Sequence, residues 1–246
     1  MRILGIGERN KDVFHYGESL RLCPDAPVPV FSLLHTTETN GMAKNVENNL
    51  KSLGAKTHLL TNENYDNITK TRFIDNRTNH MFLRVDKNDD SYGKLEEEHI
   101  KFINFSEFDA VIVSDYDKGF LTTDILKEIS KRHPLTFIDT KKKIGEWAEG
   151  FSFIKLNFSE YESNKQFLTE NILRNTIITK GPLGCTYRGE VYPVKTVEVK
   201  DTSGAGDTFV AALCYQYINT GDYASAIIFA NECATKVVQR RGVSVI

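Results

Sequence analysis

The sequence predicts an α/β protein built on one mostly parallel sheet with helices on both faces. Short apolar, β-rich runs alternate with amphipathic runs along most of the chain, and such repetition is typical of a parallel sheet covered on both sides. The length of 246 residues, 40% of them hydrophobic, suffices for one such sheet. Because no repeat or Pro/Gly/Ser-rich linker divides the chain, we expect a single domain over residues 1–246.

The expected elements follow from the periodicity of apolar residues. Strands are predicted at 2–7, 28–34, 56–60, 110–115, 135–139, 151–156 and 175–180, followed by the pair 185–189 and 191–194. Helices are predicted at 42–54, 93–105, 122–132, 159–167, 206–219 and 223–240, where apolar residues recur at spacings of three and four. The stretch TRFIDNRTNHMFLRVD at 71–86 has two β-rich arms around a polar turn, which indicates a hairpin and a candidate lid.

Charge and composition narrow the class of ligand. Thirty-one basic and 33 acidic residues give a net charge of −2, so there is no basic field for nucleic acid or an anionic membrane. No apolar run reaches the ~20 residues of a membrane span, and the four cysteines and six histidines show no metal-binding spacing. We therefore expect a cytoplasmic protein with reduced thiols and a small-molecule ligand.

The motif with the most specific chemistry is DTSGAGDT at 201–208, directly before a long apolar helix. Gly204 and Gly206 allow backbone N–H groups to converge, and the helix adds its positive N-terminal end, so the loop is suited to an anion. Asp207, in the first helical turn, could take the proton of an alcohol that attacks a phosphoryl group. The alternative is that Asp207 only caps the helix.

With this motif the sequence resembles the ribokinase-like (PfkB) carbohydrate kinases, whose signature is D-T-x-G-A-G-D, and the resemblance covers almost the whole chain. Within the family it is most similar to the kinase domain of bacterial D-glycero-D-manno-heptose 7-phosphate kinases. The segments that carry this likeness, in the same order, are RLCPDAPVPV (21–30), GMAKNVENNLKSLGA (41–55), ITKTR (68–72), FLRVD (82–86), VSDYDKG (113–119), IDTK (138–141) and NFSEYE (157–162).

The resemblance implies an ATP-dependent sugar kinase with a central sheet and a small β lid made by segments of about 12–37 and 68–87. It implies Asp207 as the catalytic base, with Gly204, Ala205 and Gly206 as the anion hole for the transferred phosphoryl group. Asn157 and Glu160 match an N-x-x-E motif that acts through water on Mg²⁺, although a polar first helical turn is the alternative. The implied nucleotide contacts are Asn157, Thr179, Lys180, Gly181, Gly184 and Asn231.

On the sugar side, the resemblance implies contacts from Asp12, Gly41 and Asn45, and it places Asp115 nearby in VSDYDKG. A phosphate on the substrate requires charged donors. The candidates are Lys70, Arg72, Arg84, Lys118 and Lys141, of which the matched segments favour Arg72, Arg84 and Lys141. Asp201 and Thr202 stand where many relatives help to bind a monovalent cation such as K⁺, or they end a strand. The implied acceptor is the anomeric hydroxyl of a heptose 7-phosphate, on a route to lipopolysaccharide, and a homodimer is expected.

The sequence departs from the family pattern at three places. Gly41-Met42 stands where the family has two glycines, which places a thioether where the backbone would approach the sugar. Glu8 replaces an aspartate after the first strand. Only about 12 residues, 56–67, separate the first long helix from ITKTR, too few for a full parallel crossover, so one βα unit is expected to be missing, with a sheet edge exposed.

Other functions are less consistent with the residues. Gly5-Ile6-Gly7 follows the first strand, but the third glycine of a dinucleotide fingerprint is Asn10, and no P-loop motif occurs. Another sugar kinase of the same family remains open. So does a binding module that retains the fold without turnover, which Met42 and the missing unit favour and which Asp207, the glycine loop and N-x-x-E oppose.

Overall fold

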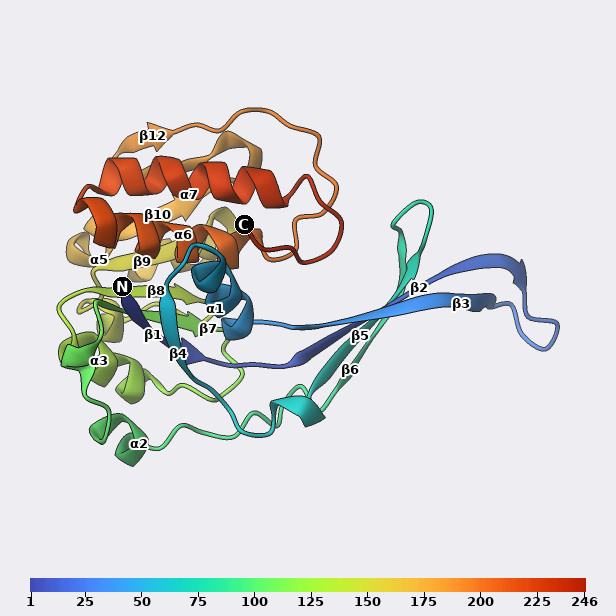
Figure 1. The fold of residues 1–246 in the computed structure, drawn as a ribbon, viewed down its shortest axis with the longest axis horizontal. Coiled ribbons are helices and arrows are strands. Elements are labelled where there is room, and N and C mark those ends of the chain that lie inside the picture. Colours follow the sequence, from blue (N-terminus) through green and yellow to red (C-terminus); the bar gives the residue numbers. More distant parts are fainter.

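An eight-stranded sheet forms the centre of the molecule (Figure 1), and the computed structural model describes residues 1–246. The strand order is β12-β11-β10-β9-β8-β7-β1-β4. The strands are β1 (Arg2–Gly7), β4 (Lys56–Leu60), β7 (Ala110–Asp115), β8 (Thr136–Thr140), β9 (Phe153–Asn157), β10 (Thr176–Thr179), β11 (Cys185–Tyr187) and β12 (Glu190–Tyr192). Pairing is parallel from β10 to β4 and antiparallel for β11 and β12, so the predicted mostly parallel sheet is confirmed.

Helices cover both faces of this sheet, as predicted (Figure 1). The helices are α1 (Ala43–Ser52), α2 (Glu97–Lys101), α3 (Thr123–Arg132), α4 (Phe158–Asn164), α5 (Glu170–Arg174), α6 (Ala205–Thr220) and α7 (Tyr223–Val237). Alternate strand residues point to opposite faces, so the buried apolar side chains form two cores. Ile3 belongs to the core with α1, α6 and α7, whereas Leu4 belongs to the core with α2, α3 and α5.

Two predicted helices are shorter than the periodicity indicates. The helix expected at 93–105 is reduced to α2, because Ile100 is its only buried residue and Phe102 is 89% exposed. A helix with so little buried surface gains little from packing. The helix expected at 159–167 is α4 followed by a 3₁₀ turn at Lys165–Phe167, and α5 was not predicted.

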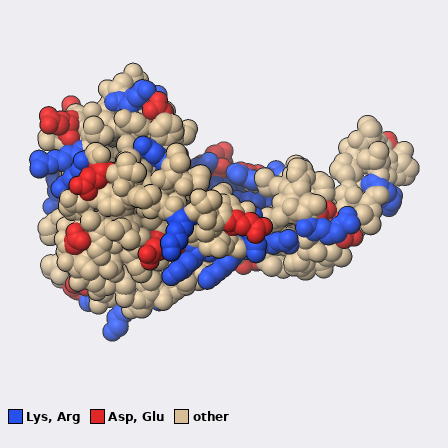
Figure 2. Space-filling model, turned by 90° about the horizontal axis from the view of Figure 1, so that it is seen from above, with Lys and Arg blue, Asp and Glu red and all other residues tan.

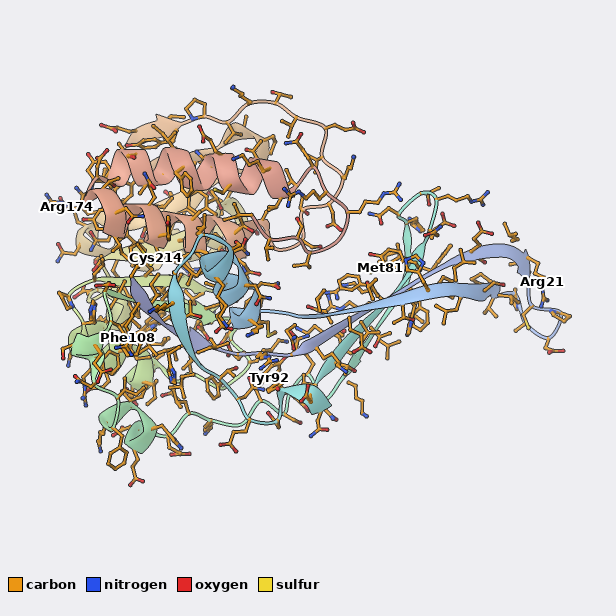
Figure 3. The ribbon with its side chains drawn as sticks, viewed as in Figure 1. Arg21, Met81, Tyr92, Phe108, Arg174 and Cys214 are labelled. Carbon is orange, nitrogen blue, oxygen red and sulfur yellow. The ribbon has the colours of Figure 1, made fainter.

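A second sheet projects from the body as a long arm (Figures 1 and 2). Its order is β3-β2-β5-β6, with strands β2 (Lys11–Leu22), β3 (Pro29–Asn40), β5 (Thr69–Asp75) and β6 (Met81–Lys87). Parallel pairing of β2 with β5 joins the hairpin predicted at 71–86 to a longer N-terminal hairpin. Arg21 lies at the tip of the arm and Tyr92 near its junction with the body (Figure 3). The strand expected at 28–34 thus belongs to this arm sheet and not to the central sheet.

The connection between β4 and the arm sheet contains no helix. After Leu60 the chain makes only a 3₁₀ turn at Tyr65–Asn67 before entering β5, and β4 is the edge of the central sheet. The segment between β4 and β5 thus contains no further strand and no α-helix.

Candidate active site

The candidate site lies where α6 begins, beside the carboxyl ends of the central strands. Gly204 precedes α6 in the left-handed conformation, with φ of 78°, which a residue without Cβ adopts at no steric cost. Its carbonyl accepts the Thr208 N–H at 2.9 Å, and no side chain caps the helix. The first amides of an α-helix lack intrahelical acceptors. The turn therefore presents N–H groups and a positive helix end to a ligand.

Asp207 is held in this first turn by two hydrogen bonds and is only 3% exposed. The Tyr116 hydroxyl donates to Oδ1 at 2.9 Å, and the Asn45 amide donates to Oδ2 at 3.2 Å. Burial, together with the charge of Asp139, raises the pKa of Asp207 to about 6, although both hydrogen bonds oppose the shift. The carboxylate is therefore charged above pH 6 and can accept a proton there. Asp207 does not cap α6, because its side chain bonds to other elements.

A buried ion pair lies directly beneath the glycine loop. Lys155 Nζ, on β9, donates to Asp139 Oδ2, on β8, at 2.9 Å, and the residues are 4% and 8% exposed. A Cβ on Gly206 would lie 3.0 Å from that Nζ, so the absence of a side chain at 206 leaves space beside the ammonium. Asp139 Oδ1 is buried without a hydrogen-bond partner. This pair places a positive charge and a free acceptor at the anion-binding turn.

Asp12 and Arg72 lie together at the base of the arm sheet. Arg72 Nη1 donates to Asp12 Oδ1 at 2.7 Å, across the parallel pair β2–β5. A Cβ on Gly41 would lie 2.2 Å from Asp12 Oδ2, so only glycine allows this approach of backbone to carboxylate. Asn45 belongs to the same place, because it follows Gly41 by one helical turn and bonds to Asp207. The structure thus brings four predicted sugar-side residues next to the predicted base.

The basic residues proposed for a substrate phosphate are all paired with carboxylates. Arg84 lies opposite Arg72 in the β5–β6 register and makes a two-pronged contact with Asp86. Lys141 pairs with Glu160. Lys70 and Lys118 share Asp89, at 3.1 and 2.5 Å. A substrate phosphate would therefore have to compete with an existing carboxylate for any of these cations.

Asp115, which the sequence predicts as a sugar contact, is buried. It is 1% exposed, accepts the Thr140 hydroxyl at 2.6 Å, and accepts the Asp117 N–H at 3.2 Å. This geometry holds the loop after β7 and leaves no exposed carboxylate for a ligand.

Asn157 and Glu160 form a capping box at the start of α4. Asn157 Oδ1 accepts the Glu160 N–H at 2.9 Å, and Glu160 Oε2 accepts the Asn157 N–H at 2.7 Å. The capping alternative for N-x-x-E is therefore realised. Oε1 of Glu160 also pairs with Lys141. The charges of Asp139 and Asp207 raise the pKa of Lys141, so Lys141 and its partner Glu160 lie near both carboxylates. The two carboxylate oxygens of Glu160 are hard donors of the type that Mg²⁺ prefers.

A cavity of about 260 Å³ opens between the glycine loop and α7. Predicted nucleotide residues among its lining are Thr179, Gly181, Gly184 and Asn231, together with Ala205 and Gly206 of the signature. Lys180 lies outside this lining and borders the neighbouring hollow with Asn157. Asn231 donates its amide to the Tyr192 carbonyl at 3.0 Å, so its N–H group supports the wall of the cavity. The remaining lining is largely apolar, which suits the face of a nucleotide base.

Asp201 and Thr202 form the turn before the glycine loop. Asp201 accepts the Ser203 N–H at 2.8 Å and the Gly242 N–H at 3.1 Å, which ties the turn to the C-terminal segment. The structure contains no group of three or more His, Cys, Asp or Glu side chains that could hold a metal ion. None of the helices combines the length and apolar character that a membrane crossing requires.

Three residues of this site were not singled out by the sequence: Tyr116, Asp139 and Lys155. A signal was available for Lys155, because a lysine inside the apolar strand FSFIKL must find a buried partner. Tyr116 and Asp139 carry no such signal, since their contacts come from elements distant in sequence.

Met42 does not point toward the sugar side. It is 4% exposed and belongs to the apolar core that includes Leu4, Ile6 and Tyr92. The expectation of a thioether beside the sugar is therefore wrong. The reason is the backbone: Met42 has φ of 58° and ψ of −131°, the second position of a turn in which Lys44 N–H donates to Gly41 O at 3.3 Å. Met42 thus adopts a backbone conformation that favours glycine, and its side chain is directed into the core.

Comparison with known proteins gives consistent results. The family model of the pfkB family carbohydrate kinases matches residues 39–245. Among curated relatives, the bifunctional protein HldE of Helicobacter pylori (strain J99) is 31% identical, with 98% of this chain and 63% of that protein covered. HldE of Nitratiruptor sp. is 29% identical, with 98% and 62% covered. The chain therefore spans less than two thirds of these relatives. The alignments extend over 293 positions against 246 residues here, so at least 47 positions have no counterpart in this chain.

The fold has solved counterparts. Ribokinase from Thermotoga maritima superposes with a TM-score of 0.72 at 17% identity, covering 98% of this chain and 94% of that one. The nucleoside kinase of Methanocaldococcus jannaschii, described as an archaeal member of the ribokinase family, gives 0.71 at 17% identity, with 98% and 93% covered. At these identities the similarity establishes the fold, and the predicted ribokinase-like architecture is confirmed.

Proposed function

Because the chain belongs to the PfkB family of carbohydrate kinases, which transfer a phosphoryl group to an alcohol, we propose that it phosphorylates a sugar phosphate with Asp207 as the base. The observation that carries this proposal is the placement of Asp207. A buried carboxylate of raised pKa lies between the anion-binding turn at Gly204–Gly206 and the Asp12–Arg72 pair. A hydroxyl held by Asp12 and Asn45 would face the carboxylate on one side and the phosphoryl group on the other.

The phosphoryl donor is ATP with Mg²⁺, as is general in this family. The cavity beside the glycine loop supports this donor, because its apolar lining fits a base and Ala205 and Gly206 of the loop form part of that lining. Asn157 and Glu160 would hold Mg²⁺ through water, and Asp139 Oδ1, buried without a partner, is a further free oxygen nearby. Bound Mg²⁺ would neutralise charge on the phosphates. Lys155, at the same turn, would stabilise the developing negative charge.

The proposed acceptor is the anomeric hydroxyl of a heptose 7-phosphate. The support is the ordered set of segments that resemble the heptose-phosphate kinases, together with the concentration of basic residues at the junction of body and arm (Figure 2). Arg72 is the first candidate for the substrate phosphate, because it already lies at Asp12, with Arg84 opposite. Lys141 is tied to Glu160 on the metal side, so we assign it to the transferred phosphate.

The arm sheet is proposed to be a lid and the contact surface of a homodimer. Its strands β3 and β6 are exposed along most of their length, and their exposed apolar side chains include Leu33, Leu34, Leu83 and Val85. Apolar area of this extent on a thin sheet is typical of a protein contact. Light scattering should show a dimer for the wild type and a monomer for Leu33→Lys combined with Leu83→Lys; a wild-type monomer at micromolar concentration contradicts the contact.

A monovalent cation and a cytoplasmic location complete the proposal. Asp201 and Thr202 retain the turn at which the family resemblance places K⁺, although both Asp201 oxygens already accept backbone N–H groups. Turnover in KCl that exceeds turnover in NaCl at equal ionic strength would support the site, and equal rates would refute it.

The decisive experiment is a screen for ADP release from ATP and Mg²⁺ with heptose, hexose and pentose phosphates and their free sugars. We expect the highest kcat/KM for D-glycero-D-manno-heptose 7-phosphate in the wild type and a loss of several orders of magnitude in kcat for Asp207→Asn, with nucleotide binding retained. A best substrate among other sugars would identify a different sugar kinase of the family. Binding without turnover in both proteins would identify a non-catalytic module and overturn the proposal.

A further inference from the structure

We propose that Tyr116 is a positioning residue that holds the carboxylate of Asp207 for proton transfer. The inference rests on the proposed function, because it takes Asp207 to be the base. Tyr116 donates its hydroxyl proton to Oδ1 at 2.9 Å, while Asn45 donates to Oδ2 at 3.2 Å. With one donor on each oxygen, the plane of the carboxylate cannot rotate without loss of a hydrogen bond. The remaining lone pairs are then directed toward an incoming hydroxyl.

Two buried acidic side chains, Glu8 and Asp115, hold the loop that carries Tyr116. Its backbone N–H donates to Glu8 Oε2 at 2.9 Å, and the Lys118 N–H donates to Glu8 Oε1 at 3.2 Å. Between them, Asp117 adopts a left-handed conformation with φ of 55° and donates its N–H to Asp115 Oδ1. Glu8 is fully buried, so the loop has little freedom. Glu8, which stands where the family has an aspartate, thus holds the backbone of Tyr116, and the Tyr116 hydroxyl in turn holds the Asp207 carboxylate.

The groups that face Asp207 come from four elements. They are Asn45 on α1, Tyr116 after β7, Asp139 and Lys141 at the end of β8, and Lys155 on β9. Burial and Asp139 favour the protonated carboxyl, whereas Tyr116, Asn45 and Lys155 favour the carboxylate. Burial and the charge of Asp207 raise the pKa of the Tyr116 phenol well above its usual range. Tyr116 therefore remains a donor throughout the working range, and its bond selectively stabilises the ionised base.

A phenylalanine at 116 removes this donor while keeping the ring. Loss of a hydrogen bond to a charged carboxylate of this kind raises the pKa of the carboxyl group by about one or more. We expect the Asp207 carboxyl to titrate near pH 6 in the wild type and about one unit higher in Tyr116→Phe. The probe is the ¹³C resonance of aspartate carboxyl carbons in selectively labelled protein, with the Asp207 signal assigned by its loss in Asp207→Asn. This readout requires no sugar substrate.

The matched control is Tyr192→Phe, which removes a similar tyrosine–carboxylate bond, to Glu190 at 2.7 Å, on the outermost strand β12. It should leave the Asp207 titration unchanged. With an active sugar substrate, the acidic limb of the kcat profile should move upward by the same amount in Tyr116→Phe, while the KM for ATP stays within about twofold. A residue with only a structural role would lower the stability and leave the profile in place.

A second measurement does not depend on the folding of Tyr116→Phe. In wild-type protein labelled with 3-fluorotyrosine, one ¹⁹F resonance should shift with a midpoint near pH 6, and this transition should be absent in Asp207→Asn. An unshifted Asp207 titration in Tyr116→Phe, or a ¹⁹F spectrum without that transition, overturns the inference. If the Asp207 titration is shifted in Tyr116→Phe but the wild type phosphorylates no sugar, the coupling of Tyr116 to Asp207 is supported. The same result counts against the proposed kinase function.

Discussion

Replacement of Met42 by glycine and by alanine separates two opposing contributions to the stability of this chain. Met42 holds φ of 58° and ψ of −131°, the second position of a type II′ turn, which is dominated by glycine. Such a conformation costs a side-chain-bearing residue about 1–3 kcal/mol. The same side chain is buried in the core, and truncation of a buried methionine to alanine costs about 2–5 kcal/mol.

The two variants should therefore rank in an unusual order. Met42→Ala loses the packing and keeps the strain, so it should unfold about 2–5 kcal/mol more easily than the wild type. Met42→Gly loses the packing and the strain together. At an ordinary position glycine is about 0.5–1 kcal/mol less stable than alanine, but here relief of about 1–3 kcal/mol of strain outweighs that penalty. We expect Met42→Gly to be more stable than Met42→Ala by about 0.5–2 kcal/mol and less stable than the wild type.

Chemical denaturation with urea measures this order, and a thermal scan should show a difference of a few degrees between the two variants. Lys127, exposed in the middle of α3, provides the matched control, because glycine there should be about 1 kcal/mol less stable than alanine. If Met42→Gly is less stable than Met42→Ala by the amount seen at Lys127, the backbone at 42 is not strained. A Met42→Gly protein as stable as the wild type would instead show that the thioether contributes little to the core.

Four further predictions concern the site. The pKa of Asp207 is raised to about 6, so kcat should fall as pH decreases through 6; a rate that is constant from pH 5 to 8 contradicts the assignment. The raised pKa also means that the folded state disfavours the charged Asp207 carboxyl. The stability of the wild type is therefore highest below the unfolded pKa near 4 and is lost as pH rises through 6. Asp207→Asn should be more stable than the wild type by roughly 1–3 kcal/mol at pH 8 in a urea titration, and the difference should disappear at pH 4. Gly206→Ala places a Cβ 3.0 Å from the flexible end of Lys155, so the fold should persist while kcat falls by about 10–100-fold; unaltered kinetics would show that the turn does not hold the phosphoryl group. Gly184→Ala would place a Cβ 2.0 Å from the Tyr192 carbonyl oxygen, whereas a Cβ at Gly189, also of positive φ, meets nothing within 4 Å; the first variant should be destabilised by several kcal/mol and the second by about 1 kcal/mol, and equal melting temperatures would disprove the clash.

The sheet and the signature loop were predictable because their information is local. The strand predicted at 110–115 begins with the apolar run AVIV, which is flanked by polar residues, and the structure gives β7 over the same residues 110–115. DTSGAGDT was predictable because it combines a left-handed glycine, the start of a helix and a carboxylate within one turn of contiguous residues. Where the periodic signal lacked buried partners, as at 93–105, the prediction was too long.

The contacts within the site were less predictable. The sequence places Asp139 and Lys155 on two neighbouring strands, but only the register of β8 and β9, which pairs Asp139 with Lys155 directly, shows that they neutralise each other. The candidate cations for a substrate phosphate likewise appear free in the sequence, whereas each of them has a carboxylate partner in the structure. Pairing between distant segments depends on strand register and loop path, which no local pattern encodes.

By itself, the sequence determined the fold class, the family and the residue that acts as the proposed base, because apolar periodicity and a glycine-rich signature are properties of contiguous residues. Only the tertiary structure decided how that base is surrounded. Asn45, Tyr116 and Asp139 reach Asp207 from separate elements, and Met42 turns into the core because its backbone keeps a glycine conformation. Hydrogen bonds and burial of this kind act through space between segments that are up to 162 positions apart, so they exist only once the chain has folded.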